Sequence, residues 1–82
     1  METPVRSSAL LEEVRWSRRL PAPNVARMIR VAAGVSQQRL AAELCVHRMT
    51  VVRWESGERV PRGLHRVAYA QILEKLQSEL AS

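Results

Sequence analysis

The chain has 82 residues, with 13 basic and 8 acidic side chains, a formal charge of +5 and an isoelectric point near 11. This length allows one domain with a small core. The single cysteine excludes an intramolecular disulfide and a cysteine-based zinc site, and the absence of Asp, of a nucleophile–base pair and of a phosphate-binding glycine loop argues against an enzyme.

The composition favours an all-α fold. Helix-forming residues are abundant, Phe is absent, and the three glycines fall where helix ends or loops are expected. Twelve of the thirteen basic residues are arginine, whose planar fork suits phosphates and base edges. The positive charge therefore favours a nucleic-acid partner, although a surface of solvated arginines would have the same composition.

Other ligands are not indicated by the sequence. His47 and His65 lie far apart without the spacing of metal ligands, so no metal and no cofactor is expected. No apolar run has membrane-spanning length, no signal region is recognisable, and no small-molecule ligand is evident. The expected location is a reducing cytoplasm, that of the bacterial host if the gene belongs to a phage.

Residues 1–23 are predicted to form an N-terminal helical extension that ends in a proline-containing joint. After a non-helical start, its helix is expected to run from a cap at Ser7 or Ser8 to about Arg19. Two interpretations of this helix stay open: its apolar residues pack on the rest of the protein, or its arginines touch the DNA backbone or minor groove. The apolar residues are Leu10, Leu11, Val14 and Trp16, and the arginines are Arg15, Arg18 and Arg19.

Three short helices are expected next. The first is capped by Asn24 and ends at Gly34 in a left-handed conformation, and the second is capped by Ser36. Their inward residues are expected to be Val25, Met28, Ile29, Leu40, Ala41 and Leu44.

Only Cys45 and Val46 separate the second of these helices from the third. Helices joined so tightly must cross steeply, which is the geometry of a helix-turn-helix. The first turn residue needs a positive φ, which costs a side chain about 1 kcal/mol. Either this turn has a different backbone geometry from the usual one, or the protein tolerates the strain of a positive φ at Cys45.

The third helix, from His47 or Arg48 to about Trp54, presents two faces. Val51 and Trp54 can face a core. The outward row consists of Arg48, Met49, Val52 and Arg53. Arginine can read guanine and apolar groups can contact thymine methyls, so this row suits base edges in a major groove. Contact with the N-terminal helix or with a partner is the alternative for the apolar members of the row.

The sequence resembles the lambda-repressor/Cro-type (XRE-like) helix-turn-helix family. The resemblance rests on segments that occur in order and with the family spacing over about half of the chain: Ile29-Arg30, Ala33 to Gln37, Leu40-Ala41, Val46, Thr50-Val51, Arg53 to Gly57, and Pro61. It implies a helix-turn-helix DNA-binding domain of about five helices, over residues 24–82 here, with the C-terminal helix included. Cys45 and His47 depart from the usual glycine and hydroxyl residue.

The resemblance also implies roles for individual residues. Gln37 would bind a phosphate and brace the start of the recognition helix, and His47 would lie near a phosphate. Ser56 and the loop to Arg59 would approach the backbone. The base-reading positions would be Arg48, Met49 and Arg53, with Val52 alongside. Arg30 and Glu55 would form a structural ion pair.

A last helix is expected from about Arg62 to Leu80, with apolar residues at three- and four-residue spacing: Leu64, Val67, Ala68, Ile72, Leu73, Leu76 and Leu80. Its second half exceeds what a small core needs, so a homodimer is expected through this helix, the N-terminal segment or both. A dimer would read a palindrome with half-sites one helical turn apart.

These observations predict a sequence-specific transcriptional regulator that binds double-stranded DNA, most simply a Cro-like repressor that binds an operator as a dimer and occludes a promoter. The small size and the arginine-rich segment before the prolines also resemble phage repressors. An antitoxin or an accessory recombination factor, and a protein-interaction module on the same fold, are the alternatives.

Overall fold

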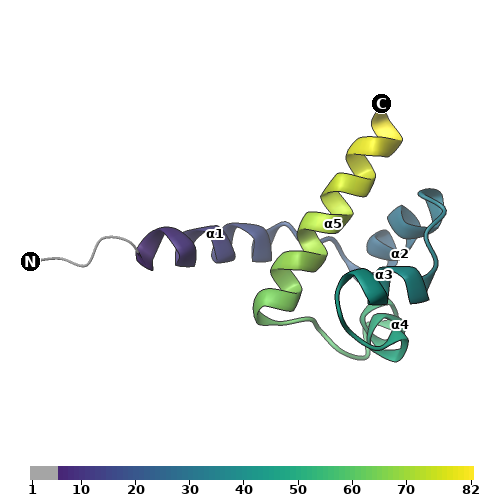
Figure 1. Ribbon diagram of the computed structural model, residues 1–82, viewed down its shortest axis with the longest axis horizontal. Coiled ribbons are helices and arrows are strands. Elements are labelled where there is room, and N and C mark those ends of the chain that lie inside the picture. Colours follow the sequence, from purple (N-terminus) through teal and green to yellow (C-terminus); the bar gives the residue numbers. More distant parts are fainter. Residues whose placement is uncertain (1–5) are drawn as a thin grey trace, which may run out of the picture.

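The computed structural model describes residues 6–82, with side chains from Ser8 onward, and this part of the chain contains five helices and no strand. The helices are α1 (Arg6–Arg18), α2 (Pro23–Ala32), α3 (Gln37–Glu43), α4 (Arg48–Ser56) and α5 (Gly63–Ala81) (Figure 1). The prediction of an all-α helix-turn-helix fold is confirmed. The non-helical start was expected for residues 1–6. Residues 1–5 lie outside the described residues, and the expectation was wrong for Arg6, which is the first residue of α1.

The helix α1 projects from the body formed by α2 to α5 (Figure 1). It begins at Arg6, so Ser7 and Ser8 lie inside the helix and neither is its cap. The interpretation in which Leu10, Leu11 and Trp16 pack on the domain was wrong for the two leucines, which are exposed together with Val14, whereas Trp16 is half-buried. The apolar spacing places these residues on one face of a helix, but it cannot show whether another element lies opposite that face.

The core lies where α2, α3, α4 and α5 meet. The tilted rings of Trp54 and Tyr69 lie 5.0 Å apart, centroid to centroid, and join the end of α4 to the middle of α5. The buried cluster consists of Ala26, Ile29, Leu40, Ala41, Leu44, Val51, Trp54, Tyr69 and Leu73. Leu76 packs against this cluster from α5, whereas Leu64 and Leu80 are exposed. The expected inward position of Leu64 was therefore wrong.

The helix α2 differs from its prediction at both its start and its inward face. It begins at Pro23, which follows the N-cap residue Ala22, so Asn24 is not the cap. Proline suits the first turn because its φ is already helical and its missing N–H has no partner there. Val25 and Met28 are exposed, and the buried residues of α2 are Ala26, Ile29 and Arg30. Because Arg30 is buried, the inward face of α2 is the one that carries Ala26, Ile29 and Arg30. The apolar residues Val25 and Met28 therefore point outward, contrary to the prediction from apolar spacing.

The turns that close α2 and α3 have the same hydrogen-bond pattern. After α2, Gly34 has a φ of 73° and the Val35 N–H donates to the Arg30 carbonyl. After α3, Cys45 has a φ of 57° and the Val46 N–H donates to the Ala41 carbonyl. Both are the left-handed helix ends that glycine favours. The turn therefore keeps the expected geometry, with a side chain at the strained position.

Candidate nucleic-acid interface

The helix α4 supplies the central surface of the candidate site. His47 is its N-cap residue, in an extended conformation and without a side-chain capping bond. Its inward residues are Val51, Trp54 and Glu55, which are buried. Its outward row keeps the predicted order: Arg48 and Met49 are exposed, and Val52 and Arg53 are half-buried. Two arginines and two apolar side chains therefore lie along one accessible side of this helix.

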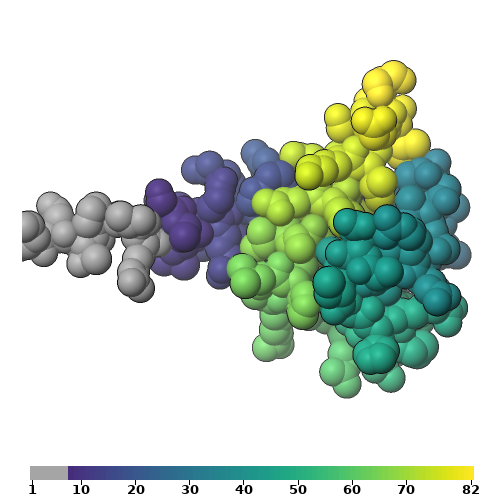
Figure 2. Space-filling model, viewed as in Figure 1, coloured from purple at the N-terminus to yellow at the C-terminus, as the bar shows by residue number. Residues whose placement is uncertain are grey.

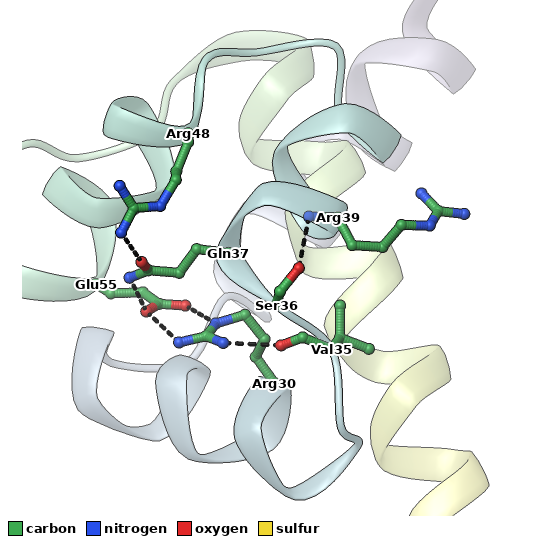
Figure 3. A network of polar contacts seen from close by, with 7 residues as sticks. All are labelled: Arg30, Val35, Ser36, Gln37, Arg39, Arg48 and Glu55. Atoms are coloured by element: carbon green, nitrogen blue, oxygen red, sulfur yellow. Dashed lines mark hydrogen bonds and ion pairs between the residues drawn. The ribbon is translucent and has the colours of Figure 1, made fainter.

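A buried ion pair attaches α4 to α2. Arg30 Nε lies 2.6 Å from Glu55 Oε2, and Arg30 Nη2 donates to Oε1 at 2.9 Å (Figure 3). The third guanidinium nitrogen donates to the Val35 carbonyl at 2.8 Å. The hydrogen bond to Glu55 raises the pKa of Arg30 above its ordinary value, although burial acts in the opposite direction. The structure thus contains the pair that the resemblance implies, with the charge of Arg30 neutralised inside the protein.

Gln37 extends this network to the exposed side of α4. Its Nε2 donates to Glu55 Oε1 at 3.1 Å, and its Oε1 accepts a hydrogen bond from Arg48 Nη2 at 3.2 Å (Figure 3). A chain of side chains therefore runs from the buried carboxylate to an exposed guanidinium. Because Ser36 caps α3 by accepting a hydrogen bond from the Arg39 N–H at 3.0 Å, as predicted, the start of α3 that carries Gln37 is itself fixed.

Two open clefts flank α4. One, of about 400 Å³, lies beside its start and is lined by Arg27, Arg30, Ser36, Gln37, Gln38 and Arg48. The other, of about 620 Å³, lies beside its end and is lined by Thr50, Arg53, Trp54, Glu58, Arg59, Val60, Pro61, Arg62 and His65. Arginine dominates the charged lining of both clefts, so anions are attracted on each side of the outward row.

The loop after α4 is held by local hydrogen bonds. Ser56 Oγ donates to the Arg53 carbonyl at 3.1 Å and accepts from the Glu58 N–H at 3.3 Å. The Arg59 N–H also donates to the Arg53 carbonyl, at 3.2 Å. These bonds leave the side chain of Arg59 exposed beside Arg53, so the loop adds a cation to the second cleft.

A sequence model of the helix-turn-helix family matches residues 27–76, which is more than half of the chain. The chain belongs to the lambda-repressor-like helix-turn-helix family. Neither a curated protein nor a solved structure matches the chain. The family consists of DNA-binding transcription regulators, and within it the α3–α4 pair forms the helix-turn-helix.

The structure brings the candidate residues of this family member to one side of the domain. Gln37 begins α3 and its side chain reaches Arg48 at the start of α4, where His47 is the N-cap residue. The outward row lies along α4, and Ser56 and Arg59 lie at its end. Sequence reasoning missed three residues of the flanking clefts, Arg27, Arg62 and His65. Arg27 is separated from α4 by twenty residues, and only the tertiary fold brings it there. Arg62 and His65 at the start of α5 could have been inferred, because that start follows the loop directly.

Two further findings concern the described residues. They contain no group of three or more His, Cys, Asp or Glu that could hold a metal ion. Across residues 6–82, no helix is both long enough and apolar enough to cross a membrane.

Proposed function

We propose that this protein is a sequence-specific repressor of the Cro type, which binds a palindromic operator as a homodimer and occludes a promoter. In this proposal α4 enters the major groove, and Arg48, Met49 and Arg53 read base edges with Val52 alongside. Residues 24–82 act as the DNA-binding domain and residues 1–23 as an extension of it. The protein acts without a cofactor, in the bacterial cytoplasm where its operator lies.

The observation that carries the proposal is the bracing of Arg48. An unrestrained arginine on a surface loses side-chain entropy when it meets a base. The guanidinium of Arg48 is already held by Gln37, which is held in turn by Glu55. Preorganisation of this kind favours a specific contact over general attraction to phosphate. The two clefts on either side of α4 carry arginines that attract phosphates. The proposed contacts with the DNA backbone are Gln37, His47, Ser56 and Arg59.

The first experiment measures binding to duplex DNA at low and at near-physiological salt. It compares DNA that flanks the protein's own gene with a scrambled duplex of equal length. A preference for the native DNA that survives the higher salt is expected, because base contacts release fewer counterions than phosphate contacts do. Equal binding to both duplexes that collapses with salt would contradict operator recognition.

Substitution of the reading residues localises the preference. Arg48→Ala and Arg53→Ala are each expected to remove about 1–3 kcal/mol of discrimination, while the helical circular-dichroism signal is retained. Arg39→Ala is the matched control, because Arg39 is an exposed arginine on the side of α3 away from Arg48 (Figure 3). Unchanged preference in both α4 variants would remove α4 from the reading surface.

A second candidate function is a protein-interaction module. It is favoured by the exposed apolar side chains of α2, which are Val25, Met28 and Val31. A partner protein could cover this face. If the protein shows no operator preference in the salt experiment, this function becomes the leading one.

A further inference from the structure

A single acidic side chain lies among the arginines that flank α4. Of the described residues that line the two clefts, only Glu58 is acidic, and its side chain is 67% exposed. A carboxylate at this place repels phosphates, so it lowers the affinity for any duplex. An ion pair this exposed also adds little to the stability of the fold. Neither affinity for DNA nor stability therefore explains a glutamate beside the end of α4.

Glu58 lies against the side chain of Arg53, one of the proposed reading residues. The contact joins Glu58 Oε2 to Arg53 Nε, at 3.9 Å. Nε is the guanidinium nitrogen nearest the aliphatic stem, and Nη1 and Nη2 form the end of the fork. Within the described part of the chain, the Arg53 guanidinium makes no other ion pair and no side-chain hydrogen bond. The end of the fork therefore stays available for the two acceptors of a guanine.

The backbone after α4 fixes where Glu58 lies. Gly57 ends the helix with a φ of 81°, a left-handed conformation that turns the chain back toward the last turn of α4. The Glu58 N–H then donates to Ser56 Oγ at 3.3 Å, and the Arg59 N–H donates to the Arg53 carbonyl at 3.2 Å. The loop is thus tied to the same residue whose side chain Glu58 contacts. In Figure 2 no other element covers this loop on the visible face.

The two proposed reading arginines have a similar arrangement. Gln37 accepts a hydrogen bond from Arg48 at the start of α4, and Glu58 lies against Arg53 at its end. In each case an acceptor outside α4 restrains a side chain that would otherwise lose entropy on meeting a base. The acceptors differ in charge, because Glu58 also offsets part of the attraction of Arg53 to phosphates. A specific contact is then favoured over a general one.

We infer that Glu58 is a positioning residue of the DNA interface: it holds Arg53 from the Nε side, leaves the end of the guanidinium to a guanine, and disfavours binding of Arg53 to phosphates. The inference rests on the proposed function, because it assigns Glu58 a role in the reading of an operator. Glu58 then lowers the overall affinity for DNA and raises the ratio between native and unrelated sequences.

The first test compares Glu58→Gln with the wild type in duplex binding at near-physiological salt. Glutamine keeps the shape of the side chain and removes its charge. The affinity for a scrambled duplex is expected to rise, and the ratio of native to scrambled affinity to fall about two- to fivefold. Glu43→Gln is the matched control, because Glu43 is paired with Arg39 and lines neither cleft. An unchanged ratio in Glu58→Gln, or an equal fall in Glu43→Gln, would overturn the inference.

A double-mutant cycle shows whether Glu58 acts through Arg53. In the Arg53→Ala background, Glu58→Gln should still strengthen binding to both duplexes, but it should no longer change the ratio of their affinities. In the Arg48→Ala background it should lower this ratio as much as it does in the wild type. A fall that persists without Arg53 would mean that Glu58 contacts the DNA itself, which contradicts the positioning role.

Selection of binding sites from randomised duplexes locates the effect within the site. Glu58→Gln should weaken the guanine preference at the base pair that Arg53→Ala also affects, and it should leave the positions that depend on Arg48 unchanged. A loss of preference spread evenly over the site would indicate a general effect of charge and would overturn the inference.

Nitrogen relaxation of the protein without DNA separates failure of this inference from failure of the proposed function. The order parameter of Arg53 Nε should be higher in the wild type than in Glu58→Gln, whereas that of Arg39 Nε should be the same in both. A wild type without sequence preference would contradict operator recognition, and the reading role of Glu58 with it. Sequence preference together with equal Arg53 order parameters in the two proteins would contradict the positioning role alone.

Discussion

The guanidinium of Arg30 and the carboxylate of Glu55 meet through two hydrogen bonds, of 2.6 and 2.9 Å, although 25 residues separate them in the chain. Both side chains are more than nine-tenths buried. The pair joins α2 to the end of α4, and through Gln37 it reaches the exposed Arg48. One buried contact thus links the stability of the domain to the position of the proposed reading surface.

Removal of one member of the pair should be far more costly than removal of an exposed pair. Arg30→Ala leaves a carboxylate buried without its partner, and we expect a loss of about 3–5 kcal/mol in the free energy of unfolding. Arg39→Ala, which breaks the exposed pair between Arg39 and Glu43, should cost less than about 0.5 kcal/mol. Urea titration followed by circular dichroism measures both. If both variants lost a similar amount of unfolding free energy, burial of the ion pair would not determine how much its removal destabilises the protein.

The bracing residue should affect recognition more than stability. Gln37→Ala removes the acceptor of Arg48 and one donor to Glu55, so we expect operator discrimination to fall by about 1 kcal/mol, or roughly fivefold. Gln38→Ala is the matched control, because it changes the adjacent, exposed glutamine. The measurement is the ratio of native to scrambled duplex affinity at near-physiological salt. Equal ratios in the two variants would mean that Gln37 does not position Arg48.

Local signals were sufficient to predict most of the helix-turn-helix from the sequence. The cap at Ser36, the inward Leu40 and Leu44, and the short link at Cys45 are all decided within a few residues of one another. Each obeys a rule of backbone geometry or helical spacing. The outward row of α4 followed from the same spacing.

The errors concern features that depend on distant residues. The inward face of α2 was misplaced because apolar spacing cannot foresee that Arg30 is buried against a glutamate of α4. The packing of α1 was misjudged because the spacing of Leu10 and Leu11 shows that they share one face of a helix, but not whether another element of the chain lies opposite that face. The cleft residue Arg27 was missed for the same reason: no local pattern connects it to α4.

We expect the free energy of unfolding to fall at alkaline pH because of Tyr69. Burial, with a further contribution from the nearby Glu55, raises the pKa of Tyr69 to about 12, from an ordinary value of 10.0. The folded state therefore favours the neutral phenol. Its contribution is fully present below pH 10 and is lost as the pH rises from 10 toward 12. Because Tyr69 is the only tyrosine, ultraviolet absorbance of tyrosinate reports its titration directly.

Tyr69→Phe is the control for this dependence. The hydroxyl has no hydrogen-bond partner among the described residues, so its removal should change the free energy of unfolding by less than about 1 kcal/mol at neutral pH, or increase it. The variant should lose less stability between pH 10 and 12 than the wild type does. An identical decline in both proteins would assign the alkaline loss to other groups.

The strained turn residue offers the clearest route to a more stable protein. Cys45 holds a φ of 57°, where a Cβ is crowded against the backbone, and its side chain is exposed. We expect Cys45→Gly to raise the free energy of unfolding by about 0.5–1 kcal/mol, which is the backbone strain less the greater entropy of glycine in the unfolded chain. Cys45→Ala keeps the Cβ and should not give this gain.

Gly34 provides the reverse substitution, because it closes α2 with the hydrogen bonds that Cys45 makes after α3. A Cβ at Gly34 would meet nothing within 4 Å, so Gly34→Ala introduces backbone strain without a steric clash. It should lower the free energy of unfolding by about 1 kcal/mol. Both effects are measured as shifts of the urea midpoint, provided that the slope of the unfolding free energy against urea concentration is the same in the variants and the wild type. A loss at Gly34 without a gain at Cys45→Gly would mean that the cysteine side chain itself stabilises the turn between α3 and α4.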